Sequence, residues 1–206
     1  MVFQYFLLPR LLGLLLGDVS TLFLNFCYHL LCFSAVLLIF RDDLPDCLRW
    51  AFSHWRHFLL ISLLALAAFY AASAVFRLLI SVLQPGFSNR NDEALMGMAG
   101  SSLPLFAVTT VLLAPVSEEL LFRRLLFGQL RVKSRWGGYL VSSLCFCLIH
   151  LIGYLGKYTL LEFFLALLQY LPAGVILAWS YEKSHSIAAP IFVHMVINGI
   201  SLISIL

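Results

Sequence analysis

Long apolar runs separated by short polar loops dominate the chain. The runs lack the period-two alternation of strands, and each has roughly the 17–25 residues of a membrane-spanning helix, or somewhat more. The six runs extend over Val19 to Phe40, His57 to Leu83, Ser102 to about Leu130, Gly137 to Gly153, Thr159 to Tyr181, and Ile187 to Leu206. A further stretch, Val2 to Leu16, contains Pro9 and Arg10 and predicts either a seventh span or an interfacial helix.

The composition indicates a membrane protein. Of 206 residues, 62% are hydrophobic and 11% are charged, whereas soluble domains carry about 25% charged residues. The mean hydropathy is +0.98. A bilayer accepts only helices or closed barrels, because every backbone polar group must be satisfied internally. Since the long runs exclude a barrel, we expect an all-α polytopic transmembrane helical bundle of about six spans, forming one integral domain over residues 1–206 in contact with membrane lipid.

Charge and cysteine content narrow the function classes. A net charge of +3 is scattered over loops and offers no basic face for phosphates, so nucleic-acid binding is not expected. The five cysteines are an odd set without a C-x-x-C pair and lie mostly inside apolar runs, which indicates small packed residues. The sequence leaves the oligomeric state open.

Lys and Arg residues in the loops predict the orientation. The first, third and fifth loops carry eight of them, and the opposite side carries three. Cytoplasmic loops are the ones enriched in these residues, so the odd loops are expected to be cytoplasmic. Small size and the lack of eukaryotic targeting signals favour a bacterial plasma (inner) membrane.

Glu118, Glu119 and Arg123 lie deep inside the third run, where each costs at least about 2.5 kcal/mol at a helix centre if unpaired. Glu119 and Arg123 are four residues apart on one helix face, which predicts a structural ion pair. Glu118 points about 100° away from that face and has no helical neighbour of opposite charge, which makes it a candidate functional acid. Pro115 removes a backbone donor nearby and predicts a bent backbone beside a cavity.

Two other runs place polar side chains at a similar depth. His150 lies in the fourth run, and His194 and Asn198 lie four residues apart in the sixth. At about 1.5 Å per residue, Glu118, His150 and Asn198 are roughly 18–20 Å from the cytoplasmic helix ends. We therefore expect groups from three helices to form one buried site.

A carboxylate, two imidazoles and an amide suit peptide hydrolysis by an activated water. The carboxylate can deprotonate the water, and imidazole and amide N–H donors can stabilise the oxyanion. The same ligands, Glu118, His150 and His194, could instead hold zinc and activate its water. The chain contains no H-E-x-x-H or G-x-S-x-G, and Leu16-Gly17-Asp18 lacks the first glycine of G-x-G-D.

Three motifs now stand in order along the chain. They are E-E-x-x-x-R at Glu118 to Arg123, F-x-x-x-H at Phe146 to His150, and H-x-x-x-N at His194 to Asn198. Together they resemble the CPBP family, which contains the type II CAAX prenyl endopeptidases and the bacteriocin-processing or immunity proteins called Abi. The resemblance covers a core of residues 115–199.

The resemblance implies a helical intramembrane endopeptidase. It assigns Glu118, His150, His194 and Asn198 as catalytic residues, with Glu119, Arg123 and Phe146 as supporting residues. Glu118 would activate the water, His150 would position or polarise it, and His194 and Asn198 would form the oxyanion site. The family has been described both as glutamate-type and as metal-dependent. Asn198 is a better oxyanion donor than metal ligand, so a reaction without a cofactor is favoured, with zinc as the alternative.

The expected partner is a membrane-anchored or lipidated substrate, such as a prenylated tail, a leader peptide or a carboxyl-terminal sorting signal. One alternative is a non-enzymatic immunity or scaffold protein that binds a membrane partner through the same cavity. A proton-coupled transporter is less well supported, because the chain has no inverted repeat and no second set of buried charges.

Overall fold

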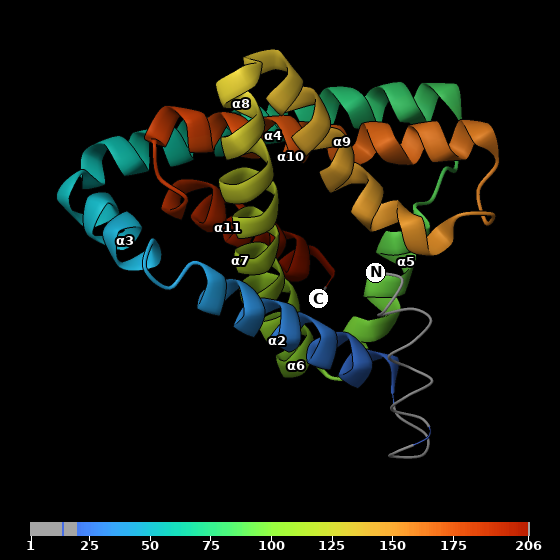
Figure 1. Cartoon of the computed structure of the whole chain (residues 1–206). Helices are drawn as coiled ribbons and strands as arrows, with labels where there is room; N and C mark the ends of the chain where they lie inside the picture. Colours follow the sequence, from blue (N-terminus) through green and yellow to red (C-terminus); the bar gives the residue numbers. More distant parts are fainter. Residues whose placement is uncertain (1–13, 15–19, 206) are drawn as a thin grey trace.

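A computed structural model describes residue 14 and residues 20–205, and the regular secondary structure of these residues is entirely helical (Figure 1). The helices are α2 (Thr21–Ile39), α3 (Leu44–Ser53), α4 (Trp55–Leu83), α5 (Arg90–Ala99), α6 (Leu103–Ala107), η2 (Val108–Leu113), α7 (Ala114–Glu119), η3 (Leu120–Phe127), α8 (Gly128–Lys133), α9 (Arg135–Leu151), η4 (Ile152–Tyr154), α10 (Leu160–Ser184) and α11 (Ala188–Ile205). Of these, η2 and η3 are π-helices and η4 is a 3₁₀-helix. The stretch Val2 to Leu16 lies outside the described residues, apart from Leu14.

Five helical segments are long and apolar enough to cross a membrane. They are Thr21–Ile39, Trp55–Leu83, Leu103–Lys133, Arg135–Tyr154 and Leu160–Ser184, and Ala188–Ser204 is a shorter apolar helix. These segments follow the six predicted runs, so the prediction of an all-α membrane bundle is confirmed. The helices α3 and α5 lie between the predicted runs. Each has only ten residues, which is too short to span a membrane.

The segment Leu103–Lys133 is the central helix of the fold. Buried positions make up 56% of its most apolar window, against 17–33% in the other four spans, and Figure 1 shows it passing through the middle of the molecule. The π-helical η2 and η3 flank the six-residue α7, which contains Glu118 and Glu119. Pro115 lies in the first turn of α7, directly after η2. The predicted backbone irregularity is therefore a π-helical segment, a feature frequent at functional sites.

The other helices surround this central segment. It contacts α2, α9, α10 and α11, whereas α4 packs on the outside against α10 and α11. Apolar side chains fill the two main interfaces. One buried cluster contains Val36, Val116, Leu120, Phe127, Ala178, Tyr181 and Ile187, and the other contains Ala65, Phe122, Phe146, Leu177, Val193 and Ile197. Of the five cysteines, which are all free, only Cys147 is fully buried.

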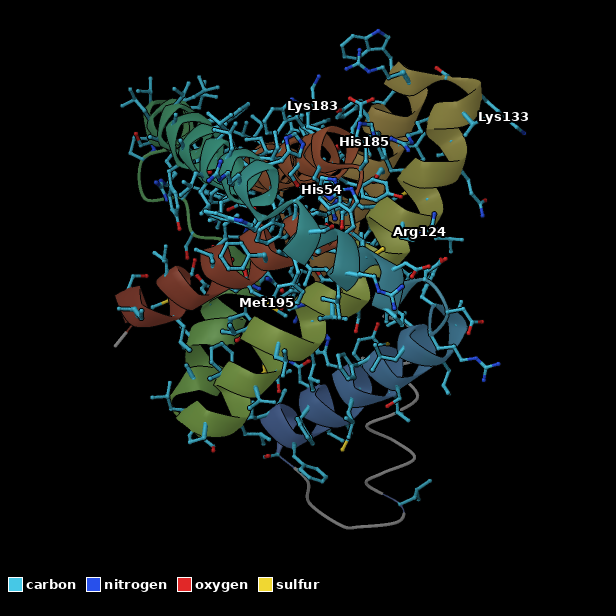
Figure 2. All side chains as sticks on the ribbon, turned by 90° about the vertical axis from the view of Figure 1, so that its left-hand side faces the viewer. His54, Arg124, Lys133, Lys183, His185 and Met195 are labelled. Carbon is cyan, nitrogen blue, oxygen red and sulfur yellow. The ribbon has the colours of Figure 1, made fainter. Side chains whose placement is uncertain are left out.

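The first, third and fifth loops meet at one end of the bundle. Arg124 forms an ion pair with Asp43 at 2.8 Å, and Arg135 forms one with Glu182 at 2.9 Å. In Figure 2 the labelled Lys133, Lys183 and His185 lie in the upper half of the view, at this end. The opposite loops also meet, because the Arg90 backbone N–H donates to the Tyr158 hydroxyl. The predicted grouping of odd and even loops at opposite ends is thus present, while the membrane side that each end faces stays a prediction.

Candidate active site

A cavity of about 490 Å³ lies beside Glu118 and is here called the Glu118 cavity. Its walls come from α2, α4, α5, the central helix, α9, α10 and α11. The Glu118 side chain is 16% exposed, and its Oε2 atom is buried without a hydrogen-bond partner among the described residues. The acid that the sequence marked as lacking a helical partner is therefore a cavity-lining acid with a free acceptor atom.

The structure brings both predicted histidines to Glu118. The Nε2 atoms of His150 and His194 each lie 3.9 Å from Glu118 Oε2. His150 Nδ1 is 2.9 Å from the Phe146 carbonyl oxygen, and His194 Nδ1 is 2.8 Å from Glu119 Oε1. Because each of these partners is an acceptor, each Nδ1 carries a hydrogen, and in a neutral ring Nε2 is then an acceptor. Three acceptor atoms consequently face one another around a gap.

Glu119 has a second contact besides the predicted ion pair. Its Oε1 atom accepts from Arg123 at 3.0 Å and also meets His194 Nδ1, and all three side chains are buried. The Arg123 guanidinium is also 3.3 Å from the carbonyl oxygens of Ala173 and Gly174 on α10. The ion pair that was predicted to be structural therefore also orients His194. This hydrogen bond joins two helices, so the spacing of residues within one helix does not reveal it.

Phe146 packs the histidines against this ion pair. Its ring lies 4.3 Å from the Arg123 guanidinium carbon, 4.8 Å from the ring of His150 and 5.8 Å from that of His194. A cation over an aromatic face is stabilised by the ring quadrupole, most strongly away from water. Phe146 is thus a shared packing surface for the groups of all three motifs.

Asn198 lines the same cavity from α11. Its Nδ2 atom donates to the Thr110 carbonyl oxygen of η2 at 2.8 Å. This bond fixes which end of the amide is nitrogen and leaves the second hydrogen of Nδ2 for another acceptor. All four residues predicted to be catalytic therefore border one space.

The three acceptors do not have the spacing of a zinc site. Zinc bonds of about 2.0–2.1 Å in a tetrahedral arrangement bring ligand atoms to about 3.4 Å from one another, whereas Glu118 Oε2 lies 3.9 Å from each Nε2. Over residues 20–205, no group of three or more His, Cys, Asp or Glu side chains could hold a metal ion. Separations of 3.9 Å are compatible with one bridging water whose hydrogen bonds are about 2.8 Å long.

Sequence reasoning missed two contributions to the cavity. His29 on α2 lines the cavity wall, and Asn25, four residues before it on the same helix, also lines the cavity. Tyr170 on α10 stacks on the His150 ring, with centroids 4.6 Å apart and planes at 26°. The spacing of Asn25 and His29 was a signal that could have marked His29, whereas Tyr170 has no polar residue three or four positions away.

Comparisons with known proteins point to one family. The family model "Type II CAAX prenyl endopeptidase Rce1-like" matches residues 100–200, which contain all three motifs. The UPF0177 protein YxdF of Lactococcus lactis subsp. lactis (strain IL1403) is 31% identical over 110 residues, which is 52% of this chain and 55% of that protein. The membrane-embedded CAAX protease MroQ of Staphylococcus aureus (strain USA300) is 30% identical over 116 residues, which is 53% of this chain and 42% of that protein.

A third relative is YdiL of Bacillus subtilis (strain 168), named as a candidate membrane peptidase. It is 27% identical over 114 residues, which is 55% of this chain and 42% of that protein. The chain spans about half the length of the curated relatives it matches. No solved structure matches the chain significantly.

The helices long and apolar enough to cross a membrane, with polar groups around one cavity, define the chain as an integral membrane protein. More narrowly, the chain belongs to the Rce1-like CAAX prenyl endopeptidase (CPBP) family of membrane proteases.

Proposed function

We propose that the protein is an intramembrane endopeptidase that hydrolyses a membrane-associated substrate with a water activated by Glu118. A prenylated tail, a leader peptide or a carboxyl-terminal sorting signal are the substrate types that fit. The observation that carries the proposal is the arrangement of Glu118 Oε2, which is buried, lacks a hydrogen-bond partner in the described chain and lies 3.9 Å from both imidazole Nε2 atoms.

The first chemical step is attack by water. A water in the gap donates one hydrogen to Glu118 Oε2 and the other to the Nε2 of His150, so its oxygen lone pairs face the cavity. The oxygen attacks the peptide carbonyl carbon while Glu118 takes the proton. A positioned general base of this kind typically contributes about 10²–10⁴-fold to the rate.

The second step breaks the C–N bond. The oxyanion accepts from the second Nδ2 hydrogen of Asn198 and from the Nε2–H of His194, which takes up a solvent proton before the attack and keeps it through the reaction. The Glu119 carboxylate at Nδ1 supplies the counter-charge for this imidazolium. Glu118 then returns its proton to the leaving nitrogen, so water is consumed and an acid and an amine are released.

The Glu118→Gln variant tests this mechanism, because an amide cannot take up the proton while its size is unchanged. The probe is an internally quenched peptide that carries a farnesylated cysteine four residues from its carboxyl terminus. It is added to proteoliposomes that contain the protein, in parallel with its twin, the same peptide without the farnesyl group. We expect a fall in kcat of about 10²–10⁴-fold. The matched control is Glu93→Gln, which changes an exposed acid on α5 and should cleave at the wild-type rate.

Continued cleavage by Glu118→Gln would remove Glu118 from the reaction. Stringent chelation distinguishes the zinc alternative, because the proposed chemistry uses no metal and cleavage should persist. Activity that disappears on chelation and returns with added Zn²⁺ would contradict the metal-free mechanism. A preference for the farnesylated peptide over its twin would identify a lipidated substrate.

A further inference from the structure

The short helix α5 is joined to the wall of the Glu118 cavity by a polar network. Asp92 accepts from Tyr170 Oη at 2.8 Å through Oδ1 and from Gln169 Nε2 at 2.6 Å through Oδ2. Tyr170 Oη also accepts from Asn91 Nδ2 at 3.0 Å. Hydrogen bonds to a carboxylate are roughly twice as strong as neutral ones. Both oxygens of Asp92 thus hold α10 at two successive side chains.

His150 needs an external constraint. Among the described residues its one direct hydrogen bond joins Nδ1 to the Phe146 carbonyl oxygen on its own helix, and its Nε2 stays 3.9 Å from Glu118, beyond hydrogen-bond range. Phe146 also belongs to α9, so it moves together with His150. These contacts do not fix the His150 ring relative to Glu118, which lies on another helix. Packing must therefore set that position.

Tyr170 supplies that packing from a different helix. Its ring lies 4.6 Å from the His150 ring at an interplanar angle of 26°, which is a stacked contact. Because the Tyr170 hydroxyl donates to Asp92, the tyrosine side chain cannot swing away from His150 without losing a bond to a carboxylate. The contacts therefore run from α5 through Asp92 and Tyr170 to the catalytic gap.

We propose that Tyr170, held by Asp92, is a positioning residue that fixes the His150 imidazole relative to Glu118. This inference rests on the proposed function for its kinetic consequence, whereas the contact it describes is measurable without any substrate. Near-attack geometry is sensitive, and a displacement of about 1 Å can cost about 10²-fold in rate.

The kinetic test compares variants that separate the ring from the hydroxyl, using the farnesylated quenched peptide. Tyr170→Leu should lower kcat about 10–100-fold with KM unchanged, because the ring that fixes His150 is lost. Tyr170→Phe keeps the ring and loses the bond to Asp92, so its kcat should fall between those of wild type and Tyr170→Leu. Asp92→Asn retains an acceptor for the hydroxyl and should retain more activity than Asp92→Ala.

Tyr158→Phe is the matched control. The Tyr158 hydroxyl belongs to the same polar region, since it donates to Asn89 Oδ1 at 3.1 Å and accepts from the Arg90 backbone N–H. The ring contacts of His150 within residues 20–205 are to Phe146 and Tyr170, not to Tyr158. We expect wild-type kcat for this variant, and an equal loss in Tyr158→Phe and Tyr170→Leu would reduce the network to general support of the fold and overturn the proposal.

A second readout does not depend on activity. In protein labelled at histidine, the ring protons of His150, assigned by their absence in His150→Gln, should be shifted by the ring current of Tyr170. That shift should disappear in Tyr170→Leu and persist in Tyr158→Phe. An unchanged His150 signal in folded Tyr170→Leu would refute the positioning role while leaving the proposed hydrolysis intact. If the wild-type protein did not cleave the peptide, the proposed function would be wrong. The ring-current shift of His150 would still establish its contact with Tyr170.

Discussion

Glu119 and Arg123 are both completely buried, and a single hydrogen bond joins them directly. Glu119 Oε2 and Arg123 Nε have no hydrogen-bond partner among the described residues. Burying two charges is costly, and removing one partner of a buried pair leaves an uncompensated charge that destabilises by about 3–5 kcal/mol. The pair therefore tolerates removal of both charges better than removal of one.

The Arg123→Met variant should lower the free energy of unfolding by about 3–5 kcal/mol, because Glu119 is then buried without its cation. The double variant Glu119→Gln with Arg123→Met should lose less. The measurement is the unfolding equilibrium in bicelles. Arg124→Met is a matched control, because Arg124 pairs with Asp43 in a partly solvent-exposed position, and surface pairs contribute about 0–1 kcal/mol. A double variant less stable than the single one would contradict this account.

At this scale the sequence predicts contacts within one helix and misses most contacts between helices. The spacing of Glu119 and Arg123 was sufficient to predict their ion pair, because four residues fix two side chains on one face. The bond from His194 to Glu119 and the stack of Tyr170 on His150 depend on the rotation of separate helices about their axes. No spacing along the chain encodes that rotation.

Among the elements, α9 and α10 make the closest helix contact around the site. A Cβ atom placed on Gly174 would lie 3.0 Å from Ser143 Cβ and 3.1 Å from Ser143 Cα. The backbones can approach this closely only because residue 174 has no side chain, as is typical of small residues between membrane helices. The approach also brings the Gly174 carbonyl oxygen to Arg123.

Gly174→Ala should therefore push α10 away from α9 and destabilise the protein by about 1–3 kcal/mol, as overpacking typically does. The thermal midpoint of the detergent-purified protein reports the effect. Gly97→Ala on α5 is the control, because nothing lies within 4 Å of the added Cβ, and it should be neutral or slightly stabilising. Equal midpoints for Gly174→Ala and wild type would show that the interface can move apart at no cost.

Hydropathy located the membrane segments, but not their internal geometry. The run from Ser102 to about Leu130 was expected as one helix with a bend, and the structure divides it into α-helical and π-helical parts. An α-helix and a π-helix can have the same apolar sequence. They differ in whether each backbone hydrogen bond spans four or five residues, and hydropathy does not reveal that difference. The helices α3 and α5 were not predicted for a different reason: each has only ten residues, and the search for long apolar runs passes over such short helices.

For the whole molecule, the two ends of the bundle differ in charge, and the basic end is predicted to be cytoplasmic. In a cysteine-free background, Lys157→Cys should react with a membrane-impermeant thiol reagent in intact bacteria. Asp42→Cys, in the first loop, should react only after the membrane is opened. Both positions are exposed. The reverse labelling pattern would invert the predicted orientation and place α5 and its network on the cytoplasmic side.

The Glu118 cavity sets a requirement on the backbone of the proposed substrate. In an α-helix each carbonyl oxygen accepts a hydrogen bond from the N–H four residues further along the chain. The proposed oxyanion site instead requires that oxygen to accept from Asn198 and His194, which both line the cavity. Under the proposed mechanism a peptide bond is therefore cleavable where the substrate is already unwound, so secondary structure selects the bond as much as side chains do.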